Sequence, residues 1–333
     1  MKAWVVAEPR AIDDGPLAQV ERPTPEPGAR EIRVRVSACG VCRTDLHLAV
    51  GELPPKHPAV VPGHEVVGTV DAAGAACERF RPGDRAGIAW LRHTCGQCRW
   101  CRSGRENLCP WSQYTGWDAD GGYAEWAVVD ERYAYALPAA FDDVHAAPLL
   151  CAGIVGYRAL KRAALPPGGR LGIYGFGASA HLVAQVALAQ GASVHVLTRS
   201  EAAQEHAREV GVTSVGSGDG VPPEPLDSAI LFAPAGGLVP RALQALDRGG
   251  TLSVAGIYLT QIPALDYERD LFQERELRSV TSNTRGDGDE FLRLAANVGV
   301  HVRTTTYPLD RADAALRDLA HDRLTGAAVL VPG

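Results

Sequence analysis

Four cysteines lie close together in the sequence, where they could bind one metal ion. Cys95, Cys98, Cys101 and Cys109 form the pattern C-x2-C-x2-C-x7-C, and four thiolates in one loop can complete a tetrahedral zinc shell. Ferredoxin iron–sulfur sites share the start of this pattern, but their fourth cysteine follows after three residues and precedes a proline. Pro110 keeps that alternative open, although the sequence has no second cluster motif. The spacing therefore predicts a structural zinc site in this loop.

A second group of potential metal ligands is dispersed along the chain. It comprises Cys-Gly-Val-Cys-Arg-Thr-Asp-Leu-His at 39–47, Gly-His-Glu at 63–65 and Cys-Ala-Gly at 151–153. A catalytic zinc ion needs three protein ligands and one open position, and residues far apart in sequence can supply them. A lone cysteine or histidine is more often a packing residue. It is the joint occurrence of these segments that indicates a second metal site.

A glycine-containing turn could bind the phosphates of a dinucleotide. It follows a predicted strand at 170–174, has the form G-x-G-x-x-A, and consists of Gly175, Phe176, Gly177, Ala178, Ser179 and Ala180. The first glycine permits a tight turn, the second lets the backbone approach a pyrophosphate, and the small last residue allows close packing of helix on strand. The alternative is an ordinary strand-to-helix turn. The strands and helices predicted on both sides favour the dinucleotide site.

The end of the next predicted strand indicates which dinucleotide is bound. NAD enzymes usually place an acidic residue about twenty residues after the glycines, where it binds the ribose hydroxyls. This chain has Thr198, Arg199 and Ser200 there, and hydroxyls with a guanidinium suit the 2′-phosphate of NADP(H). The other interpretation is that Arg199 is a solvated surface residue. We therefore expect NADP(H) in preference to NAD(H).

Two kinds of predicted structure must position these groups. Before about residue 150, short runs rich in Val, Ile and Tyr between Pro and Gly pairs predict a mainly β region. From about residue 152, strands alternate with helices, which predicts a parallel sheet. The predicted strands lie at 32–36, 66–70, 123–129, 170–174, 193–197, 228–232, 251–255 and 327–331, and the predicted helices at 178–190, 201–210, 239–246 and 288–298.

Length and composition exclude several classes of protein. The 333 residues suit two domains, and the apolar fraction of 46% is typical of a globular protein. The net charge of −6 gives no attraction to nucleic acid or to an anionic membrane. Arginines surround the four-cysteine loop as in a nucleic-acid-binding zinc ribbon, but without a basic domain they indicate a solvated rim. The sequence shows no secretory signal and no membrane-length apolar run, so we expect a cytoplasmic protein.

Together these motifs resemble the zinc-containing medium-chain alcohol dehydrogenase family over essentially the whole chain. The resemblance is greatest to bacterial aldehyde-reducing and cinnamyl-alcohol-dehydrogenase-like members, and it also rests on Pro-Gly-His-Glu at 62–65, Pro-Gly-Asp-Arg at 82–85 and Asp-Gly-Gly-Tyr-Ala-Glu at 120–125. It implies an α/β protein with a GroES-like β domain at 1–151 and 284–333. A Rossmann doubly wound parallel-sheet domain would occupy 152–283, with the active site in the cleft between the two domains.

The resemblance assigns the dispersed metal ligands. The residues that match the ligands of the catalytic zinc are Cys42, His64 and Cys151. Glu65 matches a neighbouring carboxylate that can approach the metal, whereas Cys39 does not match a ligand. Asp45 matches the carboxylate that orients His64, in keeping with the tendency of ligand histidines to donate their second N–H to an acceptor.

Other residues would act on substrate and cofactor. Thr44 and His47 match the relay that carries the alcohol proton to solvent, and Arg43 matches a pyrophosphate contact. Many relatives have an arginine after the glycine near the C-terminus as a second phosphate contact, where this chain has Gly326 and Ala327. The residues that match the lining of the substrate pocket are Trp90, Leu91 and Trp117, which core packing alone would explain almost as well.

The implied function is that of a zinc-dependent alcohol dehydrogenase or aldehyde reductase, with two zinc ions per chain and NADP(H). Its partner would be a small-molecule alcohol or aldehyde, without nucleic acid or membrane, and bacterial relatives imply a homodimer or homotetramer. One alternative is an NADPH-dependent reductase of an activated C=C bond, which the intact ligand and relay residues disfavour. The other is a non-catalytic cofactor- or metal-binding relative, because a fold alone does not fix a function.

Overall fold

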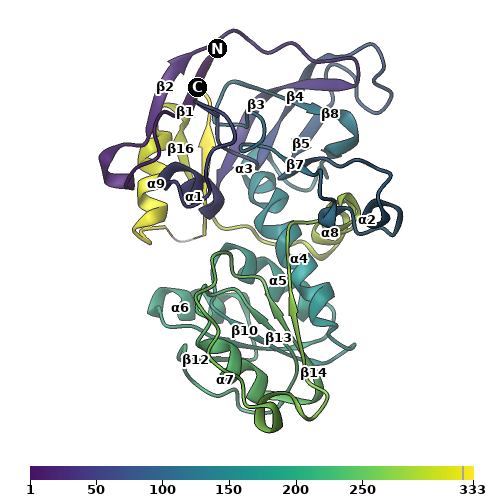
Figure 1. Ribbon diagram of the computed structural model, residues 1–333, viewed down its shortest axis with the longest axis vertical. Coiled ribbons are helices and arrows are strands. Elements are labelled where there is room, and N and C mark those ends of the chain that lie inside the picture. The colour runs from purple at the N-terminus through teal and green to yellow at the C-terminus, as the bar shows by residue number, and fades with distance from the viewer. Residues whose placement is uncertain (325) are drawn as a thin grey trace. The chain divides into compact units, whose positions relative to one another are not determined.

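The computed structural model of the chain describes residues 1–324 and 326–333. The chain forms two compact units, which are described separately. The first consists of Met1–Cys151, Ser282–Ala296 and Val302–Gly333, and the second of Ala152–Thr281 and Asn297–His301. Both ends of the chain, purple and yellow in Figure 1, therefore belong to the first unit. The N-terminal strand contacts the C-terminal segment, since the indole N–H of Trp4 donates to the carbonyl oxygen of Leu309 at 2.7 Å.

The first unit is built around a largely antiparallel sheet. Its strands follow the order β16-β17-β3-β4-β5-β9, and β8 also pairs with β3. Along the first half of β3 every second side chain is buried, as expected for a strand with one face on a core. The strands of this unit are β1 (Lys2–Val6), β2 (Leu17–Glu21), β3 (Glu31–Val41), β4 (Val66–Ala73), β5 (Arg85–Ile88), β6 (Leu91–His93), β7 (Gln113–Tyr114), β8 (Trp126–Asp130), β9 (Ala134–Ala136), β16 (Thr304–Pro308) and β17 (Ala327–Val331).

Helices and short 3-10 turns join these strands. The α-helices that lie in this unit or begin in it are α1 (Arg43–Val50), α2 (Arg99–Arg102), α3 (Asp143–Ala146), α8 (Arg285–Val298) and α9 (Ala312–Ala320). The 3-10 turns are η1 (Ile12–Asp14), η2 (Glu106–Leu108), η3 (Glu131–Tyr133), η4 (Ala147–Leu150) and η6 (Leu309–Arg311). The connections at the ends of β3, β4 and η4 carry the candidate ligands described below.

The second unit contains a fully parallel sheet. Its strands are β10 (Arg170–Tyr174), β11 (Ser193–Leu197), β12 (Ser214–Gly216), β13 (Leu226–Leu231), β14 (Leu246–Val254) and β15 (Glu276–Ser279). Their order is β12-β11-β10-β13-β14-β15, which is the 3-2-1-4-5-6 order of the Rossmann fold. The direction of winding reverses between β10 and β13. Ligands of such sheets bind at the carboxyl ends of the strands beside this reversal.

Helices of the second unit flank its sheet, as Figure 1 shows. They are α4 (Ala152–Ala163), α5 (Ala178–Ala189), α6 (Glu201–Val210), α7 (Leu238–Gln244) and the short π-helix η5 (Tyr267–Leu271). Central strands such as β10 and β13 are buried almost throughout, because helices cover both faces of a doubly wound sheet. The predicted doubly wound parallel sheet is confirmed.

Most predicted elements match the observed ones, with informative exceptions. The strands at 170–174, 193–197 and 327–331 and the helix at 201–210 have the predicted limits. The helix predicted at 239–246 ends at Gln244, because Leu246 already begins β14. The strand predicted at 123–129 begins only at Trp126, since Ala124 forms an isolated bridge with Ala3 instead. Helices α4 and α9 and strands β15 and β16 were not predicted.

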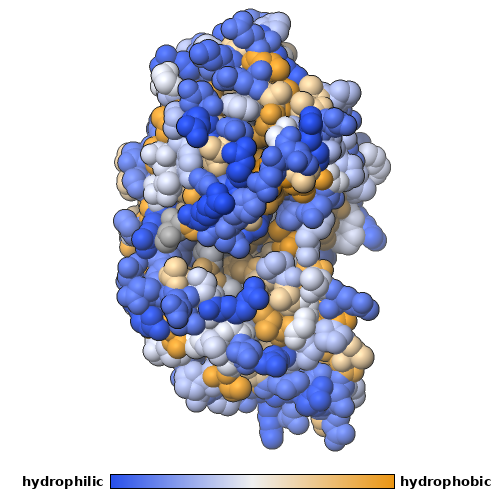
Figure 2. Space-filling model, turned by 90° about the vertical axis from the view of Figure 1, so that its left-hand side faces the viewer, coloured by the Kyte–Doolittle hydropathy of each residue, from blue (hydrophilic) through white to orange (hydrophobic). Residues whose placement is uncertain are grey.

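Hydrophilic residues dominate the visible surface. Figure 2 shows that hydrophilic side chains cover most of the visible face, with apolar residues scattered between them. Within residues 1–324 and 326–333, no helix combines the length and the apolar character needed to span a membrane.

Candidate active site

Three connections of the first unit carry the dispersed ligands. Cys42 lies between β3 and the first residue of α1, and the Cys42 N–H donates to the carboxylate of Asp45 at 2.9 Å. This bond caps the start of α1, where backbone N–H groups have no partner within the helix. His64 lies just before β4, and Cys151 lies between η4 and α4. Local helix and strand ends therefore fix each ligand.

These connections bring the candidate ligands together. One ligand atom from each of Cys42, His64, Glu65 and Cys151 lies within 4.8 Å of all the others. The Cys42 and Cys151 sulfur atoms are 3.8 Å apart, and the His64 Nε2 is 3.2 Å from the Cys151 sulfur. A tetrahedral zinc ion with Zn–S bonds of about 2.3 Å requires sulfur atoms about 3.8 Å apart. Two thiols and one imidazole thus fit zinc, and one position of the tetrahedral shell remains for an oxygen ligand.

Asp45 orients the histidine ligand. This carboxylate is only 2% exposed, and its Oδ1 lies 3.3 Å from the His64 Nδ1 and accepts from the Gly63 N–H at 3.0 Å. A carboxylate at Nδ1 fixes the ring so that Nε2 faces the metal position. The Tyr123 hydroxyl donates to the other Asp45 oxygen at 3.3 Å. Sequence reasoning missed Tyr123, and its only signal was the motif at 120–125.

Burial and close contact shift the pKa values of these groups. The hydrogen bond to Cys151, together with His64, holds the pKa of the Cys42 thiol well below its usual range, although burial opposes this. The same contact, and burial, raise the pKa of the Cys151 thiol. Burial alone would lower the pKa of His64, but Asp45 outweighs it and raises that pKa well above the ordinary value. Burial also raises the pKa of Glu65.

A glycine makes room for Glu65. A Cβ atom on Gly40 would lie 1.8 Å from a carboxylate oxygen of Glu65, which is far inside any contact distance. The Gly40 N–H also donates to the Glu65 carbonyl oxygen at 3.0 Å. Any other residue at position 40 would therefore displace Glu65 from the metal cluster. The sequence contained Gly40 within the motif at 39–47, but nothing there indicated this contact.

The proposed relay residues lie on α1 beside the metal cluster. The Thr44 hydroxyl oxygen is 3.7 Å from the Cys42 sulfur. The half-buried His47 pairs through its Nδ1 with the carboxylate of Glu52. The exposed Arg43, the expected pyrophosphate contact, forms an ion pair with Asp322.

Aromatic rings lie against the histidine ligand. The Trp90 ring meets the His64 ring edge-on with centroids 4.9 Å apart, and it stacks on Trp117 at 6.1 Å. Tyr114, which sequence reasoning missed, stacks on Trp90 at 4.8 Å. Leu91 is 1% exposed and belongs to the hydrophobic core. Trp90 thus contacts a metal ligand directly and Trp117 stacks on Trp90, whereas Leu91 is part of the core.

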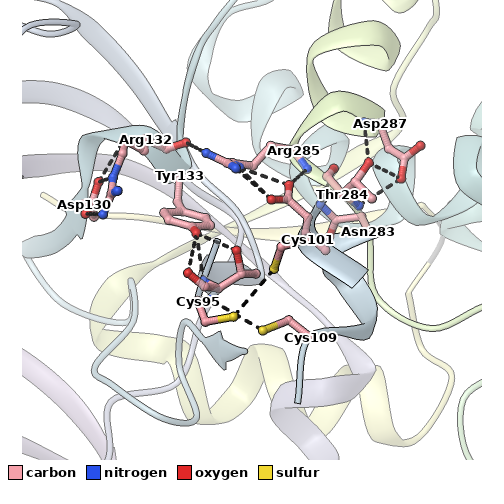
Figure 3. A network of polar contacts seen from close by, with 12 residues as sticks. Cys95, Cys101, Cys109, Asp130, Arg132, Tyr133, Asn283, Thr284, Arg285 and Asp287 are labelled. Carbon is pink, nitrogen blue, oxygen red and sulfur yellow. Dashed lines mark hydrogen bonds and ion pairs between the residues drawn. The ribbon is translucent and has the colours of Figure 1, made fainter. Parts of the chain in front are cut away.

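The four-cysteine loop forms the second cluster, and Figure 3 labels three of its cysteines, Cys95, Cys101 and Cys109. The candidate ligand atoms of Cys95, Cys98, Cys101 and Cys109 all lie within 4.8 Å of one another. The Cys101 sulfur is 3.6 Å from that of Cys98 and 4.0 Å from that of Cys95, again close to the spacing that tetrahedral zinc requires. A backbone hydrogen bond from Gln97 lowers the pKa of Cys95 to about 7, which favours the thiolate that a metal binds. The donor set therefore fits a closed structural zinc site.

Polar contacts fix this loop to its surroundings (Figure 3). The Tyr133 hydroxyl accepts from the Thr94 N–H at 2.7 Å, directly before the first cysteine. Glu106, in η2, binds Arg285 at the start of α8 through both carboxylate oxygens, with an Nη2–Oε2 distance of 2.7 Å. The Arg285 guanidinium also lies over the Tyr133 ring at 4.8 Å from its centroid. None of these contacts was foreseen from the sequence.

The second unit places the glycine turn at the carboxyl end of β10. Gly175 has φ of +86°, and a Cβ there would lie 2.9 Å from the Ala233 nitrogen that follows β13, so the turn requires glycine. Gly177 precedes α5, and no atom lies within 4 Å of where its Cβ would be. Phe176 is 7% exposed and packs edge-on against His206. Ala178 and Ser179 open the first turn of α5, whose free N–H groups suit a phosphate.

The residues expected to bind the ribose lie at the end of the neighbouring strand. Thr198 is 7% exposed, and its N–H donates to the Gly216 carbonyl oxygen at 3.1 Å. Arg199 is exposed, and Ser200 accepts from the Ala203 N–H at 3.4 Å as the cap of α6. Among residues 1–324 and 326–333, no carboxylate forms an ion pair with Arg199. The glycine turn follows β10 and Arg199 follows β11, and these two strands are adjacent in the sheet.

Known proteins share this sequence and this arrangement. The alcohol dehydrogenase GroES-like domain matches residues 28–139. The chain is 57% identical to "Probable alcohol dehydrogenase AdhA" of Mycobacterium tuberculosis, covering 99% of this chain and 97% of that protein. It is 35% identical to an alcohol dehydrogenase of Geobacillus stearothermophilus, covering 99% and 98%. A cinnamyl alcohol dehydrogenase from Sorghum bicolor superposes with a TM-score of 0.88 at 26% identity, covering 99% of this chain and 97% of that one.

These matches extend over both units, so they concern the whole chain rather than one domain. They confirm the predicted α/β class with a GroES-like β domain and a Rossmann sheet. They agree with two clusters of candidate zinc ligands and with a nicotinamide cofactor. The chain belongs to the zinc-containing medium-chain alcohol dehydrogenase family.

Proposed function

We propose that this zinc-dependent alcohol dehydrogenase or aldehyde reductase interconverts a small alcohol and its aldehyde or ketone with NADP(H), at the cluster of Cys42, His64 and Cys151. The observation that carries this proposal is the convergence of two thiols and one imidazole, with Asp45 on the second histidine nitrogen. Along the chain, Cys151 is 109 residues from Cys42 and 87 residues from His64. Such a set of three ligands leaves a position for the substrate oxygen. A purely structural site would be closed by a fourth cysteine or histidine.

The residues around the cluster have separate roles in the proposed reaction. When bound, zinc supplies Lewis acidity and the nicotinamide exchanges the hydride. In alcohol oxidation, Thr44 would take the hydroxyl proton, and His47 would pass it to solvent. Glu52 holds the His47 ring in place through its Nδ1. Trp90 shields His64 from water by lying against its ring.

The preference for NADP(H) rests on the end of β11. A carboxylate at this point would repel a 2′-phosphate, and Thr198, Arg199 and Ser200 offer none. The guanidinium of Arg199 can bind two phosphate oxygens at once. The domain limits at 151/152 and 283/284, the cytoplasmic location and a homodimer or homotetramer stay predictions.

A single set of assays tests this function. The purified protein would be incubated with NADPH or NADH and either a panel of aldehydes or a panel of conjugated enones, and cofactor oxidation followed by absorbance. We expect aldehyde reduction, a higher kcat/KM with NADPH, and about two zinc ions per chain by metal analysis. Reduction of enones but not aldehydes would overturn the alcohol dehydrogenase assignment. A higher kcat/KM with NADH would overturn the cofactor preference alone.

A further inference from the structure

A glycine-rich loop lies beside Arg199 but belongs to none of the motifs above. Residues 216–220, Gly-Ser-Gly-Asp-Gly, end β12 and continue into a turn in which the Gly220 N–H donates to the Ser217 carbonyl oxygen at 2.9 Å. β12 pairs in parallel with β11, so that Gly216 is opposite Leu197. The carboxyl ends of parallel strands lie at the same edge of a sheet. The loop therefore runs alongside the residues proposed to select the cofactor.

Gly218 is the point of contact between this loop and Arg199. A Cβ atom at Gly218 would lie 2.6 Å from the Cγ of Arg199 and 3.3 Å from the Arg199 nitrogen. The contacted Cγ is close to the main chain, so it cannot move aside as the end of a flexible side chain could. The φ of Gly218 lies outside the left-handed region, and other residues could adopt its backbone conformation. What this position requires is the absence of a side chain.

We propose that Gly218 determines cofactor specificity by leaving the space along which the Arg199 side chain lies. This inference rests on the proposed preference for NADP(H). A methyl group at position 218 would force Arg199 into another rotamer and turn its guanidinium away from the 2′-phosphate. Gly218 is thus a positioning residue that acts through Arg199.

Adenine nucleotides isolate this effect from catalysis. Binding of adenosine 2′,5′-bisphosphate and of adenosine 5′-monophosphate to the whole protein would be measured by isothermal titration calorimetry. We expect Gly218→Ala to weaken binding of the bisphosphate about tenfold, as for the loss of one charge-assisted hydrogen bond, and to leave the monophosphate unchanged. Unchanged monophosphate binding also shows that the variant is folded.

The same loop offers a matched control. A Cβ at Gly216 would meet only the Leu197 Cδ2, at 3.9 Å, and the φ of Gly216 is also outside the left-handed region. Gly216→Ala should therefore leave the affinity for both nucleotides unchanged. If it weakened bisphosphate binding as much as Gly218→Ala, the specific contact with Arg199 would be the wrong explanation.

A double-mutant cycle tests whether Gly218 acts through Arg199. Arg199→Ala should weaken bisphosphate binding, and adding Gly218→Ala to it should have no further effect. Additive losses would overturn the inference. If the wild-type protein binds the bisphosphate more tightly and Gly218→Ala does not change this, Gly218 has no such role and the NADP(H) preference stands. If the wild type binds both nucleotides equally, the preference and the inference fail together.

Discussion

The two metal clusters of this protein are assembled in different ways. The cysteines of the structural cluster come from one loop and are supported by that loop, since the Cys98 N–H donates to the Cys95 sulfur and the Cys95 N–H to the Cys109 sulfur, both at 3.4 Å. The catalytic ligands come from three separate connections and depend on the side chain of Asp45. A local cluster can form where its loop is intact, whereas a dispersed cluster exists only when the whole unit has folded.

This difference predicts how each cluster responds to change. Removing a ligand from the dispersed cluster should abolish chemistry and leave the fold, because the buried neighbours Val41, Val66 and Leu150 anchor its three connections. Removing a cysteine from the four-cysteine loop should mainly destabilise the protein, because zinc closes a loop that has few buried apolar residues.

Cys42→Ala should give the largest change. Without one thiol the catalytic metal is lost, and kcat for alcohol oxidation should fall about 1000-fold or more, since Lewis acidity supplies several kcal/mol of transition-state stabilisation. Metal analysis should show one zinc ion per chain, with the melting temperature little altered. Cys39→Ala is the control, because Cys39 lies only three residues earlier, in β3, but outside the ligand cluster. Full turnover by Cys42→Ala would disprove the assigned site.

Cys101→Ala should act mainly on stability. Loss of a structural metal is among the few mechanisms that cost about 3 kcal/mol or more, and the loop would no longer hold Glu106 in place. We expect a lower unfolding free energy in urea and one zinc ion per chain, whereas the remaining folded protein keeps its kcat. Cys77→Ala, a half-exposed cysteine outside both clusters, should change neither quantity. A Cys101→Ala protein of normal stability would remove the contrast between the clusters.

Asp45→Asn should weaken the catalytic metal without removing a ligand. The amide still fits the pocket, but it no longer provides the charge that orients His64, so zinc affinity should fall about 10- to 100-fold. Competition with a chromogenic chelator would measure this loss. Tyr123→Phe removes only one neutral hydrogen bond to the same carboxylate and should cost less than about tenfold. Equal losses in both variants would mean that Asp45 acts through packing rather than charge.

The contrast between the clusters also explains what could be read from the sequence. The spacing of the four cysteines indicates their cluster directly, because a short loop leaves few other arrangements. The dispersed ligands were identified only through the family resemblance, since their distances along the chain carry no geometric information. The role of Tyr123 was missed for the same reason, because its contact with Asp45 joins residues 78 positions apart. Gly40 was missed because its function is to leave space for the Glu65 side chain, and a sequence does not show which residues come into contact.

The secondary structure shows a similar limit. The central strands β10 and β11 were predicted with correct limits because buried parallel strands are continuous apolar runs. The edge strands β15 and β16 are mostly exposed and lack both an apolar run and alternation, so no periodicity revealed them. Helix α4 contains Gly153 and Gly156, which lower helix propensity and conceal its apolar face.

The smallest expected effect concerns Glu106, which fixes the four-cysteine loop to Arg285. Burial alone would raise the pKa of Glu106, but the hydrogen bonds from Arg285 outweigh it and hold that pKa below its usual value. A lowered carboxyl pKa stabilises the fold above the unfolded-state pKa, and this contribution is lost as the pH falls through the folded-state pKa. Since Arg285 is 37% exposed, solvent screening limits the pair to about 1 kcal/mol.

Glu106→Gln should therefore lower the unfolding free energy by about 1 kcal/mol at pH 7, and the difference from the wild type should shrink below about pH 4.5. Urea unfolding at several pH values would measure this difference. Glu8→Gln is the control, since Glu8 forms an exposed surface pair with Arg10 at 3.6 Å and should change nothing measurable. A difference that stays constant with pH would show that Glu106 supports the loop through its shape and not its charge. The local cluster would then owe its position to packing, as the three backbone connections of the dispersed cluster do.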